Sequence, residues 1–202
     1  MDDIVKAAIA KWPNVPHCYG WLGLDARGNW YLRDDQAQAA GRFCAPFSEA
    51  SGQLDRHLAS KGSILKHEKL IDFIARNYEC DNSASSEAKG QWFFQNGPQR
   101  VYVELQATPY IWRVGAAPDF DVTAHTGQVA ITQRCIIDEH GRVYLETALG
   151  FGLVHSLDML QVADAIEQGL WVPQEVLAHD LPMRFGYVRS PEAANKALLN
   201  KA

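Results

Sequence analysis

The chain has 202 residues, 47% of them hydrophobic and 21% charged, and a formal net charge of −5. This composition is that of a globular protein and excludes wholesale disorder. The length suits one large domain or two small, closely packed ones. The acidic balance and the lack of a clustered basic stripe argue against nucleic acid as a partner. No apolar run reaches the roughly 20 residues of a bilayer-spanning helix, so no membrane partner is expected.

The N-terminus and the cysteines indicate where the protein resides. Met1-Asp2-Asp3-Ile4 lacks the basic and apolar regions of a signal peptide, which predicts a cytoplasmic location. The four cysteines show no C-x-x-C spacing, so we expect buried thiols rather than disulfides or zinc ligands. They are Cys18, Cys44, Cys80 and Cys135.

The first part of the chain reads as helix, hairpin and helix. Residues 2–12 carry apolar side chains at helical spacing after two early aspartates, which predicts a helix. Residues 19–24 and 29–33 flank a turn that begins with Asp25 and ends with Gly28, a pattern typical of a β-hairpin. Residues 36–77 are mostly helical in character, with Ser63 as a predicted N-cap.

From residue 91 onward the hydrophobic period becomes that of a sheet. Asn96-Gly97 predicts a hairpin between strands 92–95 and 100–105. Further strands are predicted at 110–114, 119–125, 128–137 and 142–147. A helix then runs from Ser156 to Gly169, Pro173 opens a short helical turn, residues 183–189 form an edge strand, and Ser190 begins the last helix.

These elements together predict an α+β fold of antiparallel sheets with segregated helices and two related halves, each containing a hairpin. Residues 1–90 form the N-terminal helix–hairpin–helical half. Residues 91–202 form an antiparallel sheet half with C-terminal helices, packed with the first as one compact unit.

The relation between the halves rests on a repeated pattern, D-x-x-G-x-[WV]-Y-L. It occurs at residues 25–32 and again at 138–145, an offset of 113 residues (138 minus 25). Such an offset suits a duplicated half-domain. The alternative is convergence, because any hairpin of this turn class favours Asp, Gly and a β-forming Tyr.

The order of these motifs resembles a family. The first hairpin is followed by Leu70-Ile-Asp-Phe-Ile-Ala-Arg, Gly90-Gln-Trp-Phe-Phe, Arg100-Val-Tyr-Val-Glu and Thr108-Pro-Tyr. Over residues 19–150 it is similar to uncharacterised proteobacterial proteins with duplicated α+β repeats. That resemblance implies a bacterial protein of the same fold, without an assigned activity and with a suggested role in signal transduction. This chain has Gln106-Ala107 where that family tends to carry an acidic residue.

One predicted strand carries a polar face that suits chemistry. In strand 119–125 alternate residues share a face, which groups Asp119, Asp121, Thr123 and His125. Two carboxylates and an imidazole are ligands for a divalent metal and are able to move protons. The competing explanation is an amphipathic strand with its polar face toward solvent.

Aromatic residues crowd into the predicted sheet around residues 92–112. Trp92, Phe94, Tyr102, Tyr110 and Trp112 are candidates to share one face. Such a face suits a small-molecule pocket or a protein interface, and the alternative is a core packed against the helices. The polar and aromatic lining of the predicted ligand site is Arg100, Glu104, Tyr110, Trp112 and Arg113.

We therefore expect a ligand- or partner-binding regulatory or signalling protein without catalysis. The alternative is a metal-assisted hydrolase using Asp119, Asp121 and His125. No catalytic or cofactor motif occurs, so the cofactor is unassigned. The expected partner is an unknown small molecule or protein, and the chain also allows a homo-oligomer.

Overall fold

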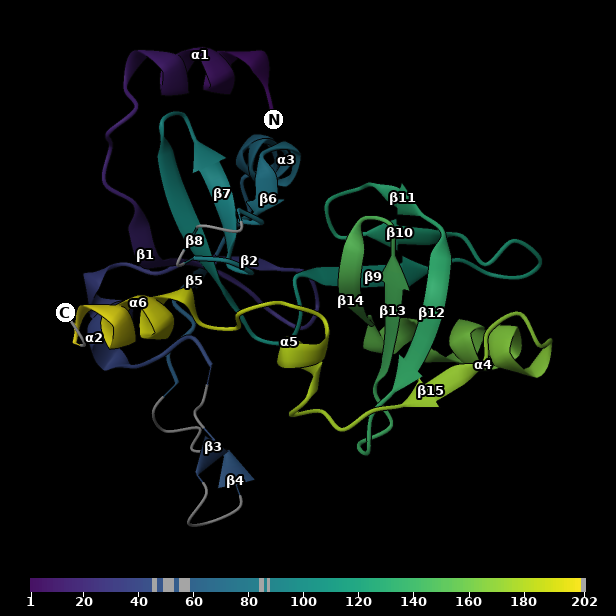
Figure 1. The fold of residues 1–202 in the computed structure, drawn as a ribbon. Coiled ribbons are helices and arrows are strands. Elements are labelled where there is room, and N and C mark those ends of the chain that lie inside the picture. Colours follow the sequence, from purple (N-terminus) through teal and green to yellow (C-terminus); the bar gives the residue numbers. More distant parts are fainter. Residues whose placement is uncertain (45–46, 49–52, 55–58, 84–85, 87, 201–202) are drawn as a thin grey trace. The chain divides into compact units, whose positions relative to one another are not determined.

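The fold of the chain comes from a computed structural model that describes residues 1–44, 47–48, 53–54, 59–83, 86 and 88–200. It contains two compact units (Figure 1). The first unit comprises residues 1–25, 29–106 and 188–202, and the second comprises residues 26–28 and 107–187. The second unit is therefore inserted in the sequence of the first.

The first unit is built on a six-stranded sheet with the order β5-β2-β1-β8-β7-β6. All neighbouring pairs are antiparallel except β1 and β8, which run parallel. The strands are β1 (Cys18–Leu24), β2 (Trp30–Leu32), β5 (Ser63–Ile64), β6 (Tyr78–Cys80), β7 (Trp92–Asn96) and β8 (Gln99–Leu105). A separate two-stranded ribbon pairs β3 (Phe47–Ser48) with β4 (Gln53–Leu54).

Helices of the first unit are α1 (Asp3–Lys11), α2 (Asp35–Ala40), α3 (Glu68–Arg76) and α6 (Pro191–Leu199). Helix α6 packs on β1 and β8, and α3 packs on β7. In α3, Phe73 and Ile74 turn toward the sheet, where Phe73 meets Phe94 edge-on and Ile74 is buried. This hydrophobic contact places α3 against the sheet.

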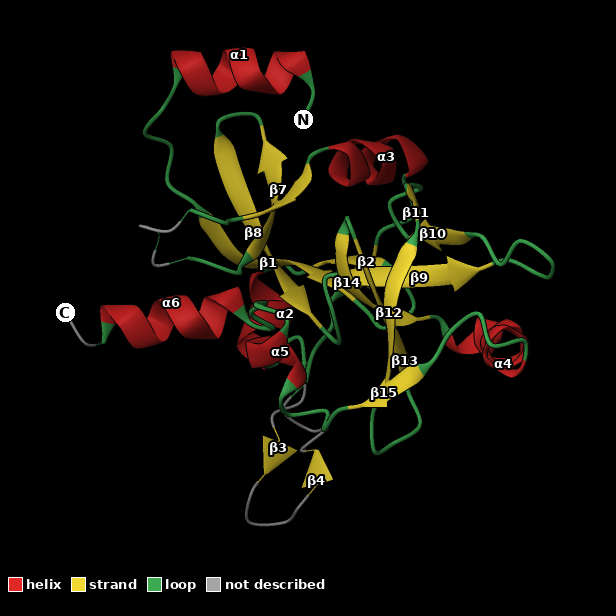
Figure 2. Ribbon diagram, turned by 45° about the vertical axis from the view of Figure 1, so that its right-hand side comes forward, coloured by secondary structure: helices red, strands yellow, loops and turns green. Residues whose placement is uncertain are grey.

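The second unit is built on a seven-stranded sheet with the order β11-β10-β9-β14-β13-β12-β15. Figure 2 draws the strands in yellow. The strands of this sheet are β9 (Tyr110–Val114), β10 (Val122–Ala124), β11 (Val129–Ala130), β12 (Thr132–Ile137), β13 (Val143–Thr147), β14 (Gly150–Val154) and β15 (Pro173–Glu175). β11 and β12 follow each other in the chain, separated by Ile131, but lie near opposite ends of the sheet order. The sheet must therefore curl back on itself. Short helix η2 (Ser156–Asp158), α4 (Met159–Glu167) and α5 (Leu181–Arg184) complete the unit.

The two repeated turns have the same geometry. In each, the aspartate N–H donates to the carbonyl of the residue four positions on, at 3.0 Å, from Asp25 to Asn29 and from Asp138 to Arg142. The aspartate Oδ1 accepts the N–H of that same residue at 2.9 Å in both turns. The turn glycines have φ of +82° and +74°, the left-handed region that glycine adopts without strain.

The equivalence extends beyond the turns to four strands. Tyr31 pairs with Ile64, and Tyr144 pairs with Leu153, so β5-β2-β1 and β14-β13-β12 share one register. A parallel strand lies on the other side of each hairpin, β8 in one unit and β15 in the other. Whether duplication or convergence produced this match stays a prediction.

The structure confirms the α+β class, the hairpins and helices α1, α4 and α6. The predicted division at residue 90 separates β6 from β7 and β8, which the structure joins in one sheet through backbone hydrogen bonds. Ser63 is not an N-cap but part of β5, and α3 begins after His67, whose side chain accepts from the Leu70 N–H.

Other local expectations were wrong. The predicted strand 119–125 shortens to β10, because Asp119 lies in a turn after the cis Ala117–Pro118 bond. The helical turn predicted at Pro173 is strand β15, whose partner β12 is distant in sequence. The edge strand predicted for 183–189 instead contains the end of helix α5.

Two further observations concern the cysteines and the length of the helices. All four cysteines are free thiols, with Cys135 buried and the other three half-buried. None of the helices in the described part of the chain has the length and apolar character to cross a membrane.

The tight packing of Gly152 in β14 gives a stability prediction. A Cβ at this position would lie 2.4 Å from Trp112 Nε1 and 2.6 Å from the Tyr110 carbonyl oxygen. We expect Gly152→Ala to lower the free energy of unfolding by about 3 kcal/mol, because the buried backbone has to move. Gly115→Ala is the matched control, since its nearest neighbour is at 3.5 Å. Equal urea midpoints for the two variants would contradict the packing argument.

Candidate functional site

The candidate residues from the sequence fall into both units. Arg100 and Glu104 lie on β8 in the first unit, and Tyr110, Trp112 and Arg113 lie on β9 in the second. On β8, Arg100, Tyr102 and Glu104 alternate and so share one face of the strand. Each end of this face is a polar cluster of a different kind.

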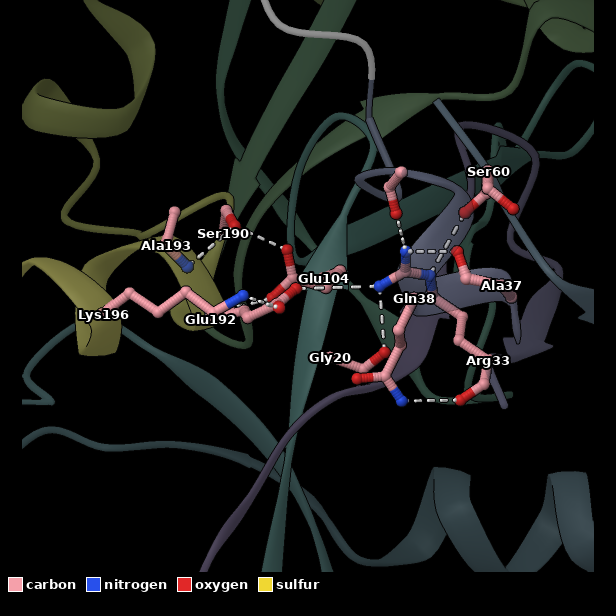
Figure 3. Close-up of polar contacts among 11 residues, drawn as sticks. Gly20, Arg33, Ala37, Gln38, Ser60, Glu104, Ser190, Glu192, Ala193 and Lys196 are labelled. Carbon is pink, nitrogen blue, oxygen red and sulfur yellow. Dashed lines mark hydrogen bonds and ion pairs between the residues drawn. The ribbon is translucent and has the colours of Figure 1, made fainter. Parts of the chain in front are cut away.

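The Glu104 end is a buried anchor for the C-terminal helix (Figure 3). Glu104 is 2% exposed, and its Oε2 accepts the Ser190 hydroxyl at 2.6 Å. Its Oε1 accepts the backbone N–H of Glu192 at 2.9 Å, in the first turn of α6. The Ser190 Oγ in turn caps the helix by accepting the Ala193 N–H at 3.2 Å. A carboxylate from the sheet thus satisfies N–H groups that a helix leaves unpaired at its start.

Arg33 is the fully buried cation beside this anchor. Its guanidinium donates to the carbonyl oxygens of Gly20 at 2.9 Å, Gly41 at 2.5 Å and Ser60 at 3.2 Å. Its Nη1 also lies 3.7 Å from Oε2 of Glu192. Figure 3 shows the guanidinium with Gly20 and Ser60 among its acceptors. Because its donors are directed at main-chain carbonyls, Arg33 holds neighbouring segments together and is not presented to a ligand.

The surroundings of Glu104 set its protonation. Burial raises the pKa of Glu104 above its ordinary value, although the hydrogen bonds from Ser190 and Glu192 act in the opposite direction. The nearby carboxylate of Glu192 also raises the pKa, and the charge of Arg33 lowers it. The burial of Glu104 therefore favours the neutral form of its carboxyl group over the charged form.

The Arg100 end of the face is open to solvent. Arg100 Nη1 donates to Asp81 Oδ2 at 2.8 Å, while the Arg100 side chain stays 35% exposed and that of Asp81 only 5%. The guanidinium carbon lies 4.4 Å from the centre of the Phe93 ring, a cation–π distance. Asp81 is itself held by the Ser86 hydroxyl at 3.0 Å and the Ser83 N–H at 3.2 Å. An ion pair and a ring thus orient a cation that still reaches solvent.

Aromatic side chains continue from Arg100 along the same face. Tyr19 stacks on Tyr102 with ring centres 4.6 Å apart, and His17 meets Tyr102 edge-on at 5.8 Å. Burial and the neighbouring Tyr102 raise the pKa of Tyr19 to about 12, so its hydroxyl stays protonated at neutral pH. Partial burial and the charge of Arg100 lower the pKa of His17, which keeps the imidazole neutral. We call His17, Tyr19, Asp81, Arg100 and Tyr102 the Arg100 site.

The candidate residues on β9 make their contacts inside the second unit. Tyr110 and Trp112 are buried and stack at 5.1 Å, and Trp112 Nε1 donates to the Leu145 carbonyl at 3.0 Å. Arg113 makes a bidentate ion pair with Asp158 through bonds of 2.6 and 2.9 Å. This pair connects β9 to the segment that begins α4, as an internal tie of the unit.

The metal hypothesis gains no support from the geometry. Asp119 and Asp121 are exposed, while His125 Nδ1 accepts the Ile111 N–H at 3.3 Å. Burial lowers the pKa of His125 to about 3, so the ring is neutral. Within the described ranges, no three His, Cys, Asp or Glu side chains come close enough to hold a metal ion.

The expected aromatic face is corrected by the strand register. Phe93, not Phe94, lies opposite Tyr102, while Phe94 lies opposite Val101. Trp92 and Phe94 therefore lie on the other face, and Trp92 is tilted against Tyr78 at 4.9 Å. These aromatics are buried, as the core alternative requires.

The comparisons with known proteins give a family. The model of the family described as "Protein of unknown function (DUF2946)" matches residues 1–192. The chain belongs to this family. The expectation of an uncharacterised family is thus confirmed, while proteobacterial origin and duplication are not tested. No curated protein matches the chain.

Two solved structures are similar at low identity, and both belong to DUF1285 family proteins. The protein from Shewanella baltica OS155 is 14% identical, with a TM-score of 0.39, 72% of this chain covered and 91% of its own. The protein from Silicibacter pomeroyi DSS-3 is 11% identical, with a TM-score of 0.45, 81% of this chain covered and 84% of its own. Neither description gives an activity.

Several residues of the anchor and of the Arg100 site were not predicted from the sequence. Asp81 was not among the candidate residues, yet it is buried and accepts a hydrogen bond from Arg100, which lies 19 positions further along the chain. Arg33 directly follows the D-x-x-G-x-W-Y-L pattern, at a position where the second hairpin has Glu146. That difference between the repeats was the one feature of the sequence that marked Arg33 as unusual. Nothing in the sequence marked Tyr19 and His17 except their position next to the first hairpin.

The anchor yields a pH-dependent prediction. In unfolded chains glutamate has a pKa of about 4.3. Because the folded pKa of Glu104 is raised, the native state binds this proton more tightly, and stability from this group falls as pH rises above that value. Glu104→Gln removes the titration. We therefore expect the unfolding free energy of Glu104→Gln, relative to the unmodified chain, to increase from pH 4 to pH 7 in urea titrations.

Glu146→Gln is the control, because Glu146 forms a more exposed pair with Arg134. A relative stability of Glu104→Gln that falls over the same pH range would contradict the burial argument.

Glu104→Ala should lower the free energy of unfolding by about 2 kcal/mol, since the Ser190 hydroxyl and the Glu192 N–H lose their acceptor.

Proposed function

We propose that the protein is a ligand-binding regulatory protein, with the Arg100 site as its place of binding and without a catalytic step. The supporting observation is the state of Arg100 itself. Its guanidinium is fixed by the buried Asp81 and the Phe93 ring, yet the side chain remains 35% exposed. A fixed, partly exposed cation binds a ligand with less loss of side-chain freedom than a mobile one.

The ligand class follows from the groups around Arg100. A guanidinium pairs with carboxylate or phosphate oxygens, so the ligand carries an anionic group. The half-buried Tyr19 and the exposed His17 offer aromatic surface beside the cation, which favours a ring in the ligand. Asp81 is buried and already pairs with Nη1 of Arg100, so the ligand would bind the part of the guanidinium that stays exposed. The proposed ligand is a small anion that contains a ring.

The role assigned to these residues is binding and not proton transfer. At neutral pH Tyr19 remains a hydroxyl donor, because its pKa is about 12. The regulatory role also draws on the resemblance to proteins with a suggested part in signal transduction. A cytoplasmic location belongs to the same proposal.

Thermal-shift measurements with a panel of nucleotides and aromatic carboxylates test this function. A ligand that binds only the folded protein raises its stability, by about 2.7 kcal/mol at 100 times its Kd. We expect at least one ring-bearing anion to raise Tm, and its neutral analogue to have a smaller effect. Arg100→Gln should abolish the shift by removing the charge that pairs with the anion.

Arg113→Gln is the matched control, because Arg113 also pairs with a buried aspartate. This variant should keep the ligand-induced shift, even where its own Tm is lower. Loss of the shift in both variants would indicate general destabilisation and contradict the site. The absence of any shift across the panel would contradict ligand binding itself.

A further inference from the structure

Strand β5 forms one edge of the six-stranded sheet of the first unit. It pairs on one side with β2, where Ile64 lies opposite Tyr31 and Ser63 opposite Leu32. No strand in the described part of the chain pairs with its other side. An unpaired edge is able to accept another strand through backbone hydrogen bonds.

The hydrogen-bond pattern fixes which backbone groups point outward. The Leu65 N–H donates to the Trp30 carbonyl at 2.8 Å. Leu65 and Trp30 are thus a hydrogen-bonded pair, and such pairs alternate with non-bonded pairs in an antiparallel ladder. The neighbouring pair, Ile64 and Tyr31, is therefore non-bonded, so the N–H and C=O of Ile64 point away from β2. Gly62, Ser63, Ile64 and Lys66 are all exposed, with Ile64 at 43%. The outward groups of Ile64 are therefore accessible.

Residues at the N-terminus contact the other edge of the sheet, at and beside β6. The Met1 ammonium lies 3.8 Å from Glu79 of β6, and the Asp2 N–H donates to the buried Asn77 side chain at 2.8 Å. No such tie to β5 from outside the sheet occurs in the described residues. The two edges of this sheet thus differ in how they are protected.

The exposed edge is basic in an otherwise acidic chain. Residues 61–69 contain three lysines and one glutamate, whereas the whole chain carries −5. Lys61 is engaged by Gln106 at 2.8 Å and by Asp25 at 3.9 Å. Lys66 and Lys69 are exposed, and neither forms an ion pair in the ranges that the structure describes. Two cations beside an accessible strand select for an acidic partner.

We propose that β5 is a docking edge for an acidic, extended segment of a partner protein, which pairs with the backbone of Ile64 and places carboxylates near Lys66 and Lys69. A second copy of β5 fits less well. Antiparallel pairing of two copies about Ile64 would place Lys66 of one chain opposite Gly62 of the other and so bring two lysine-rich edges together, and like charges repel. The proposal does not depend on the Arg100 site.

A labelled peptide of about eight alternating Glu and Val residues is a suitable probe, because it is extended, acidic and of strand length. The full chain should bind it saturably in fluorescence anisotropy and should not bind the matching Lys-Val peptide. Amide NMR shifts should change most at Ile64 and Lys66. Equal binding of the two peptides, or no saturable binding up to about 1 mM, overturns the proposal.

Two variants locate the contact. Ile64→Pro removes the outward N–H but no bond to β2, so it should weaken binding at least about fivefold, whereas Ile64→Val should not. Lys66→Glu should weaken binding at least about threefold, and Lys11→Glu on α1 is its charge-matched control. Undiminished binding by Lys66→Glu overturns the proposal even if Ile64→Pro fails to fold. Dimerisation of the unmodified chain that Ile64→Pro abolishes would overturn it in favour of a second copy.

Discussion

The carboxylate of Glu104 is the contact on which the first unit depends. The chain leaves this unit after Gln106 and returns at Val188, so a long segment must end where it can rejoin the sheet. Glu104 receives the returning chain by accepting from Ser190 and from the first turn of α6. One buried side chain in a central strand thereby ties the start of α6 to the sheet.

The same strand separates structural from exposed polar groups. At one end of β8 the charges of Arg33 and Glu104 are buried and directed at backbone or helix groups, as buried charges require. At the other end Arg100 is oriented by a buried carboxylate but keeps contact with solvent. The exposure of Arg100 therefore distinguishes it from the buried Glu104, although both residues lie on one face of one strand.

The sequence predicted best where the signal is local. The Asp25 and Asp138 turns and the Asn96-Gly97 hairpin depend on residues a few positions apart, and all three form as expected. The helical turn predicted at Pro173 and the beginning of the predicted strand 119–125 were wrong, because residues 173–175 pair with the distant β12 and Asp119 lies in a turn. Of the candidate site, Arg100 and Glu104 were named, but their partners Asp81 and Ser190 were not. Those partners are close only in space, and one sequence carries no record of such contacts.

The points where the chain leaves the first unit and re-enters it lie next to each other. Where the chain departs and where it returns, Leu105 N–H donates to the Arg189 carbonyl at 2.8 Å, and Arg189 Nη2 donates to the Gln106 carbonyl at 2.8 Å. The exit and the re-entry are thus adjacent points on one scaffold. A segment bounded by adjacent points can be exchanged, lengthened or lost while its host keeps its own hydrogen bonds. Residues 107–187 are thus an insertion between two neighbouring points of the first unit, and the hydrogen bonds of Leu105, Gln106 and Arg189 hold those points together.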